Sequence, residues 1–341
     1  MRWIAASVVV LAGPALGQTP PDYDFQFSTV TALGNAPYAG GGLYPFNIGR
    51  GRVDHAYRIS RLEVTTSQWM EFVNTFSTTS LAGGPNPPPF LQGPTDWWGA
   101  ERDPTYTGVG RRFRLRLGVE RAGLIPMSGI SWRDAALFCN WLHHEKSRDW
   151  LTIQGGAYDA STFTFNPDGT FNDQLTHSPG AKYWIPTLDE WFKAAHYDPH
   201  KFGPGQEGWW EYPTSSDVEP IAGLPGVGQT TAGLALPGFA EAYVPLGAYV
   251  DVQSPWGLWD LSGGAREWLE DASLDRRRRA YDGAKFREMF PIRELDTAGL
   301  SGEDPPGLSI PGLRIASAVP GPNPIVVMLI SALFATRRSR L

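Results

Sequence analysis

The chain has 341 residues, 42% of them hydrophobic, which is enough to bury a sizeable core in one large or two medium domains. Its formal net charge of −6 argues against a nucleic-acid surface, because such a surface needs clustered positive charge. The 39 Gly, 30 Pro and 14 Trp residues indicate a loop-rich fold that is held by buried aromatic rings, without long helices.

The first 17 residues have the order of a secretory signal peptide. Arg2 precedes an apolar stretch over residues 3–12, and small residues lead up to Gly17. This pattern predicts cleavage after Gly17 and export of the mature chain. The single cysteine, Cys139, excludes an intramolecular disulfide, so an exported domain must gain its stability from its core and from bound ions.

The first predicted elements are two strands and a helix. Residues 23–30 alternate in a way that predicts an edge strand, and residues 57–64 predict a second strand. Thr65 or Thr66 then caps a helix over about residues 67–76, where apolar side chains recur at helical spacing.

Two insertions and a second helix follow. Residues 80–125 carry many Gly and Pro residues and are expected to form a long surface excursion. Ser131 and Asp134 form a capping box, which predicts a helix that runs to about Lys146. Residues 150–181 are expected to form a hairpin insertion.

A third capping pair, Thr187 and Glu190, predicts a short helix to about Ala195, and Pro199 prevents its extension. Residues 212–247 have no regular pattern and are expected to be irregular. No internal repeat and no linker divides the folded part.

Residues 256–271 combine tryptophans, acidic residues and a glycine pair. Gly263 and Gly264 permit backbone angles that other residues avoid, whereas Trp259 and Trp268 favour burial. We therefore expect a structured loop inside a core. Its carboxylate and carbonyl oxygens suit a hard cation such as calcium. A glycine turn with solvated acids is the alternative.

The C-terminal segment has three parts: a proline motif over residues 319–324, an apolar stretch over residues 325–335, and an arginine cluster over residues 337–340. Eleven apolar residues are too few for a comfortable membrane span, since about 20 are needed. The segment is therefore expected to associate with a membrane only transiently.

Several segments resemble, in order along the chain, the motifs of the formylglycine-generating enzyme family, also called sulfatase-modifying factor domains. Residues 256–271 are similar to its motif G-L-Y-D-M-x-G-N-V-W-E-W, and residues 185–195 to L-P-T-E-A-E-W-E-Y-A-A. The other matches cover residues 57–72, 126–142 and 312–316. Together the five matches span roughly residues 26–317.

The resemblance implies an α+β fold, the variant of the C-type lectin architecture found in this family, loop-rich with few short helices and small antiparallel sheets. It places the domain over residues 18–318, between a signal peptide over residues 1–17 and a tail over residues 319–341. The tail resembles the PEP-CTERM type of bacterial sorting signal, although Gly321 replaces its Glu. We expect localisation at the cell envelope or outside the cell.

The resemblance also implies a calcium site. Its implied ligands are the side chains of Asp260 and Glu267 and the backbone carbonyls of Gly263 and Ala265. The chain departs from the family at Gly264, which replaces an Asn, and at Arg266, which replaces a Trp and brings a positive charge beside the ion. The family's other calcium site, upstream near Asp217, has no residue-by-residue match.

The family oxidises a sulfatase cysteine to formylglycine at a copper ion held by two cysteines. The corresponding region here is residues 279–286, and no cysteine follows it. Because a cuprous ion needs thiolates, we expect no copper site and no catalytic residue. Cys139, beside Phe138 in the second helix, is expected to be a buried small hydrophobe.

Two weaker site candidates have simpler explanations. His196 and His200 are four residues apart, but Pro199 interrupts the helix that would align them as zinc ligands. The basic run over residues 276–279 lies between acidic residues and is expected to be a solvated loop rather than a phosphate site.

Two function classes stay open. The first is an exported, calcium-stabilised binding module for a glycan, peptide or polymer, and the second is an enzyme with an unrecognised site. The paired aromatics Trp97-Trp98 and Trp209-Trp210 favour the first class if their rings are exposed for stacking on a ligand. Anchoring of loops to the core is the alternative role of both pairs.

Overall fold

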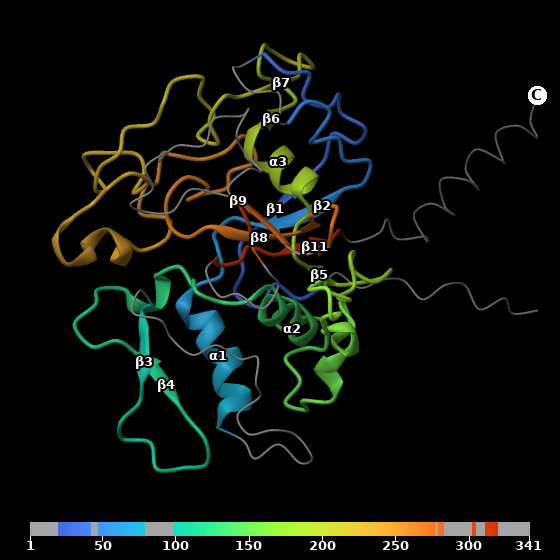
Figure 1. Cartoon of the computed structure of the whole chain (residues 1–341). Coiled ribbons are helices and arrows are strands. Elements are labelled where there is room, and N and C mark those ends of the chain that lie inside the picture. Colours follow the sequence, from blue (N-terminus) through green and yellow to red (C-terminus); the bar gives the residue numbers. More distant parts are fainter. Residues whose placement is uncertain are drawn as a thin grey trace, which may run out of the picture. The chain divides into compact units, whose positions relative to one another are not determined.

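The computed structural model describes residues 20–41, 47–78, 98–276, 279–282, 302–304 and 311–319 (Figure 1). Residues 22–318 group into one unit by their contacts. The signal peptide predicted over residues 1–17 and nearly all of the predicted tail lie outside the described residues. Both assignments stay predictions.

A four-stranded antiparallel sheet joins the two ends of the folded chain. Its order is β1 (Phe27–Val30), β2 (Tyr57–Ser60), β11 (Ala316–Ala318) and β5 (Tyr183–Trp184). All four residues of β2 are buried, because β2 pairs with a neighbour on each side. The sheet therefore places the last described strand in its interior.

All three predicted helices are present: α1 (Thr66–Ser77), α2 (Trp132–His143) and α3 (Leu188–His196). Each begins with a complete capping box. The side chain of the N-cap residue accepts the backbone N–H of the third helical residue, and the side chain of that third residue accepts the backbone N–H of the N-cap residue. Figure 1 shows α1 and α2 on one side of the four-stranded sheet and α3 on the other.

The end of α2 differs from the prediction. The helix stops at His143, because Glu145 and Lys146 have positive φ angles of +56° and +58°. The first strand is likewise shorter than expected, since Tyr23 and Asp24 lie in the left-handed region before β1 begins.

Three smaller sheets complete the fold. β8 (Glu267–Ala272), β9 (Arg279–Asp282) and β10 (Gly302–Asp304) form an antiparallel sheet in the order β10-β9-β8. β3 (Ala100–Arg102) pairs with β4 (Phe113–Leu115), inside the predicted surface excursion. β6 (Tyr197–Asp198) pairs with β7 (Gly208–Trp209) directly after α3.

Short 3-10 helices occupy several connections: η1 (Ala122–Leu124), η2 (Thr152–Gln154), η3 (Ala160–Thr162) and η4 (Pro237–Tyr243). Two of them lie in the insertion predicted as a hairpin, whose only hairpin-like pairing among the described residues is the bridge between Phe165 and Phe171. Few helices and small antiparallel sheets confirm the predicted α+β class.

Aromatic side chains fill the core, as the composition predicts. Five tryptophans besides Trp98 have essentially no exposed surface: Trp69, Trp132, Trp141, Trp191 and Trp268. Indole N–H groups pin loops to this core, since that of Trp268 donates to the carbonyl of Ile130 at 2.9 Å. Within the described residues, no helix is long and apolar enough to cross a membrane.

Candidate functional site

The loop that precedes β8 depends on its glycine pair. Gly263 and Gly264 have φ angles of +106° and +67°, in the region that favours glycine. A Cβ atom on Gly264 would lie 2.4 Å from a carboxylate oxygen of Glu63, and one on Gly263 would lie 2.8 Å from the hydroxyl of Thr231. The pair therefore lets the backbone pack directly on these two side chains, and the loop is ordered as predicted.

Glu267, a predicted calcium ligand, makes a buried ion pair instead. Its carboxylate accepts hydrogen bonds from Arg314 at 2.9 to 3.1 Å and from the indole N–H of Trp191 at 2.7 Å. Glu267 and Arg314 are 1% and 0% exposed, and Arg314 also donates to the carbonyls of Ser60 and Trp259. A cation could use Glu267 only by competing with Arg314.

Glu63, which the sequence reasoning missed, brings a further carboxyl group to this loop. It is fully buried, and its oxygens accept the backbone N–H of Ala265 at 3.2 Å. Burial raises the pKa of Glu63 well above its usual range, and the nearby charges of Glu267 and Asp260 add to this effect. The available signal was its position between two apolar residues, Leu62 and Val64, in the segment that links β2 to α1.

Asp260 lies at the other end of the loop. Burial raises the pKa of its carboxyl group to about 6, although the backbone N–H of Gly247 donates to it at 2.6 Å and Arg314 lowers the pKa. A small cavity of about 10 Å³ adjoins Asp260 and is also lined by Glu241, Thr231 and Gly264. Such a cavity is about large enough for a single water-sized species.

These donors fit the predicted calcium ion in part. In the described part of the chain, no three His, Cys, Asp or Glu side chains converge closely enough to hold a metal ion. Side chains alone therefore do not make the site, and the predicted carbonyls of Gly263 and Ala265 would be needed. Asp260 and the adjoining cavity fit the role, whereas Glu267 does not fit it while it is paired with Arg314.

A second group of buried carboxylates lies near the N-terminal end of α3. Glu270 accepts the hydroxyl of Tyr158 at 2.7 Å and the backbone N–H and Nδ1 of His177 at 2.7 and 2.9 Å. Glu190 accepts the Nε1–H of Trp184 and bonds to His55 at 2.8 Å. Each of these carboxylates is thus partnered by a histidine at the surface.

The lone thiol is placed as predicted. Cys139 is 0% exposed inside α2, and burial raises the pKa of its thiol well above the usual value. A thiol held protonated in an apolar setting is a poor nucleophile and a poor metal ligand. Residues 279–286 correspond to the region that precedes the copper-binding cysteines in the family. Of these residues the structure describes Arg279–Asp282, which form β9.

The weaker histidine candidate does not form a site. His196 is fully buried at the end of α3, where burial lowers the pKa of its imidazole to about 4 and its Nδ1 bonds to the carbonyl of Trp210. His200 instead accepts the backbone N–H of Gly205 at the surface. The two rings therefore bond to different backbone segments and do not form a zinc site together.

Among the paired aromatics that the structure describes, Trp98 and Trp209 anchor their loops to the core. Trp98 is completely buried, and its indole N–H donates to the carbonyl of Ser128 at 2.6 Å, while Trp97 lies outside the described residues. Trp209 packs on Phe192 with ring centres 5.1 Å apart. Trp98 therefore takes the alternative role, the anchoring of a loop to the core, because its large apolar surface is better buried than solvated.

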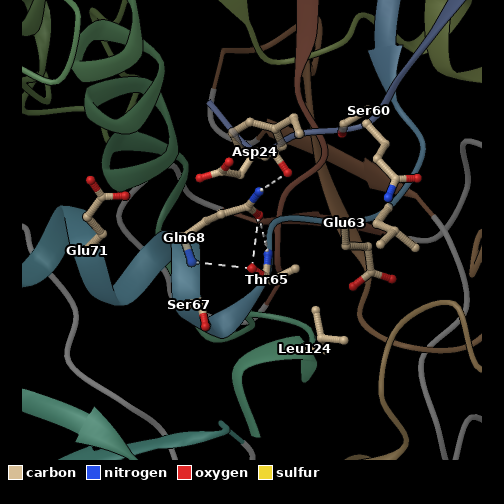
Figure 2. A pocket seen from close by; sticks show the side chains of 11 residues that line it. Asp24, Ser60, Glu63, Thr65, Ser67, Gln68, Glu71 and Leu124 are labelled. Carbon is tan, nitrogen blue, oxygen red and sulfur yellow. Dashed lines mark hydrogen bonds between the residues drawn. The ribbon is translucent and has the colours of Figure 1, made fainter. Parts of the chain in front are cut away.

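A cleft of about 280 Å³ opens beside the N-terminal end of α1 (Figure 2). Its eleven lining residues include Asp24, Glu63 and Glu71 and contain no basic side chain. Figure 2 shows Gln68 between Asp24 and Thr65, and its amide bonds to both. The polar groups at the centre of the cleft are therefore already partnered.

The family model described as "Sulfatase-modifying factor enzyme 1-like domain" matches residues 30–295. Among solved structures, the chain is similar to variable protein 1 of Treponema denticola, with 17% identity, a TM-score of 0.50, and coverage of 86% of this chain and 95% of that one. This likeness shows the fold alone.

Two further structures share low identity with the chain. CarF has 19% identity and a TM-score of 0.46, with 87% of this chain and 99% of that chain covered. PvdO from Pseudomonas aeruginosa has 15% identity and a TM-score of 0.44, with coverages of 86% and 92%. A comparison with curated proteins finds no match.

Proposed function

Because the chain belongs to the family of sulfatase-modifying factor enzyme 1-like domains, we propose that it is a member that binds a ligand and does not generate formylglycine. One observation carries this proposal: the sequence has a single cysteine, and its thiol is buried in α2 with a raised pKa. The copper chemistry implied by the resemblance needs two thiolates, which this chain lacks.

The proposed module is exported and stabilised by calcium. Support for calcium comes from Asp260, the cavity beside it, and the surplus of buried carboxyl groups around Arg314. A bound calcium ion would supply positive charge to this loop, with Asp260 and the carbonyls of Gly263 and Ala265 as ligands. The expected ligand classes are a glycan, a peptide or a polymer outside the cell.

The enzyme class rests on one observation. His177 bonds through Nδ1 to buried Glu270, and its side chain is 27% exposed, so the imidazole is oriented at the surface. Such a pair can act in general acid–base chemistry. An enzyme with an unrecognised site is therefore the second candidate, and its oxidoreductase type comes from the family resemblance alone.

An activity assay tests the main proposal. The purified domain, incubated with a sulfatase-derived cysteine peptide with and without copper, is expected to form no formylglycine detectable by mass spectrometry. The Cys139→Ala variant is expected to lose some stability through the deletion of a buried side chain and to keep ligand binding unchanged. Turnover that disappears in Cys139→Ala would overturn the proposal. A glycan, peptide and polymer array then identifies the ligand.

Cell fractionation tests export. The full-length protein is expected to leave the cytoplasm, and deletion of residues 319–341 is expected to shift it between the envelope and the medium. Identical fractionation of the two forms would show that the tail is not a sorting signal.

A further inference from the structure

Arg61 carries a guanidinium group that is held in place without an acidic partner. It lies on the connection between β2 and α1 and is half-buried. Several other arginines pair with carboxylates, as Arg133 does with Asp173 at 2.7 Å. Within the described part of the chain, the side chain of Arg61 makes two hydrogen bonds to neutral oxygens, and no carboxylate forms an ion pair with it. Its positive charge therefore has no direct counter-charge.

Three contacts fix the orientation of this guanidinium. Its central carbon lies 4.0 Å from the centre of the Trp259 ring, which is a cation–π distance. Nε donates to the carbonyl of Gly257 at 2.7 Å, and Nη2 donates to Oε1 of Gln253 at 3.4 Å. A Cβ atom at Gly257 would lie 3.2 Å from Nη2, so the glycine leaves room for this close approach. The group is therefore preorganised, which lowers the entropy cost of binding a ligand.

The donors of Arg61 are only partly used. A guanidinium has five N–H donors, of which Gly257 takes the one on Nε and Gln253 takes one on Nη2. Nη1 has no bond within the described residues and is not a buried atom, so it is open to solvent. Nη1 and Nη2 form the terminal fork of the side chain, whose geometry matches the two oxygens of a carboxylate.

Charged groups of both signs occur in this part of the chain. Asp251 is exposed and forms no ion pair with Arg61. Asp260 follows Trp259 in the chain and accepts a backbone N–H, whereas Arg314 donates to the carbonyl of Trp259 at 2.9 Å. A mixed surrounding of this kind suits a ligand with a single carboxylate better than a densely charged polymer.

The backbone beside the fork is already bonded. The N–H of Gly257 donates to the carbonyl of Ser254 at 2.8 Å, and the N–H of Trp259 donates to the carbonyl of Arg61 at 2.8 Å. A peptide bound as an added strand needs free backbone groups, so recognition here must use side chains. The half-buried rings of Trp256 and Trp259 offer apolar surface of the kind on which a sugar ring packs.

We propose that Arg61, held against Trp259, is a subsite for the carboxylate of an acidic sugar. This inference rests on the proposed binding function and narrows its ligand to a glycan that carries a uronate. The carboxylate accepts hydrogen bonds from Nη1 and Nη2, and the sugar ring packs on indole surface beside them. These tryptophans are not the pairs that the sequence suggested for stacking.

The test compares two probes by isothermal titration calorimetry with the full chain: a trisaccharide that ends in one glucuronate, and the methyl ester of the same trisaccharide. The calcium concentration is held constant, because carboxylates bind calcium themselves. The free acid is expected to bind about tenfold or more tightly than the ester, since only the acid offers a charged acceptor. Its affinity is expected to fall at high salt.

The variants separate the fork from the charge. Arg61→Gln is expected to weaken binding of the acid about tenfold or more and to leave binding of the ester unchanged. Arg61→Lys keeps the charge without the fork, so it should retain only part of the affinity. Arg148→Gln, which removes the same charge from an exposed position after α2, is the matched control and should change nothing. Melting temperatures show that each variant is folded, and Arg61→Lys carries the comparison if Arg61→Gln is not.

Equal affinity for the acid and the ester, or unchanged affinity in both Arg61 variants, would overturn the inference. So would an Arg61-dependent affinity for a peptide of Glu residues that equals or exceeds that for the acidic trisaccharide, because the partner would then be a protein. If the trisaccharide does not bind while an array identifies another ligand whose affinity Arg61→Gln leaves unchanged, the binding function stands and only the Arg61 assignment fails.

Discussion

Two regions next to β8 bury carboxylates in different ways. Around Arg314, three carboxyl groups share one permanent cation: those of Glu63, Asp260 and Glu267. Near the N-terminal end of α3, Glu190 and Glu270 are each partnered by a histidine. Burying an ionised group is costly unless it is paired, so both regions need a counter-charge. The first region has too few permanent positive charges, whereas in the second the histidine His177 has a shifted pKa.

The difference appears in the cause of the pKa shifts, which are upward in both regions. In the region around Arg314, the pKa of Asp260 is raised to about 6 and that of Glu63 is raised well above its usual value. Near α3, burial lowers the pKa of His177, but its hydrogen bond to Glu270 and the charge of that group more than offset this, so the pKa is raised. All three groups hold their protons more tightly in the folded state.

Removing the permanent cation is expected to have the largest effect. Arg314→Met leaves Glu267 as an uncompensated buried charge, which should cost about 3–5 kcal/mol of unfolding free energy in urea titrations. Arg314→Lys keeps a charge without the planar fork that binds both oxygens, so its loss should be smaller. A loss below about 1 kcal/mol in Arg314→Met would show that the ion pair does not hold this region together.

Calcium should act on the region around Arg314 and not on the region near α3. At about 100 times its dissociation constant, calcium should stabilise the domain by about 2.7 kcal/mol near neutral pH, measured as a rise in melting temperature. The effect should fade as pH drops through about 6, because Asp260 becomes protonated. Asp260→Asn should abolish the shift.

Glu267→Gln tests the remaining predicted side-chain ligand. Abolition of the calcium-dependent shift would restore Glu267 to the site despite its bonds to Arg314, and an unchanged shift would remove it. If calcium has no effect on the wild-type chain at any pH, the calcium site is wrong.

The region near α3 predicts a histidine-dependent pH profile. A raised folded-state pKa means that the stabilisation from His177 is fully present below its unfolded pKa of about 6.5 and is lost as pH rises through the folded value. His177→Gln should therefore cost about 1 kcal/mol at pH 5.5 and less at pH 8.5. His55→Gln is the control and should cost less at pH 5.5, because that side chain is 58% exposed and its pairing is screened. Equal pH slopes for wild type and His177→Gln would contradict this.

Glu63→Gln should have the smallest effect. The raised pKa of Glu63 favours its protonated form in the folded state, so its stabilising contribution falls as pH rises above its unfolded value. A neutral amide of similar shape can still accept the N–H of Ala265. We expect no change in unfolding free energy near pH 5 and a gain of up to about 1 kcal/mol near pH 8. A clear loss at both pH values would show that an ionised Glu63 is needed.

Local signals in the sequence predicted the helices well. Each cap and its partner three residues later are neighbours along the chain, so Ser131 with Asp134, or Thr187 with Glu190, is readable without the fold. The end of α2 was predicted less well, because a left-handed Glu145 has no side-chain signature. The family match and the observed elements confirm the predicted fold class.

In the candidate site, too, some features could be predicted from the sequence and others depend on the tertiary structure. The sequence by itself determined the loop with its glycine pair, the buried Cys139 and the family, since these depend on residue type and spacing within short segments. Only the tertiary structure decided that Glu267 pairs with Arg314 and that Glu63 reaches Ala265. Those contacts join residues 47 and 202 positions apart, and charge balance in a buried site depends on which distant segments the sheet brings together.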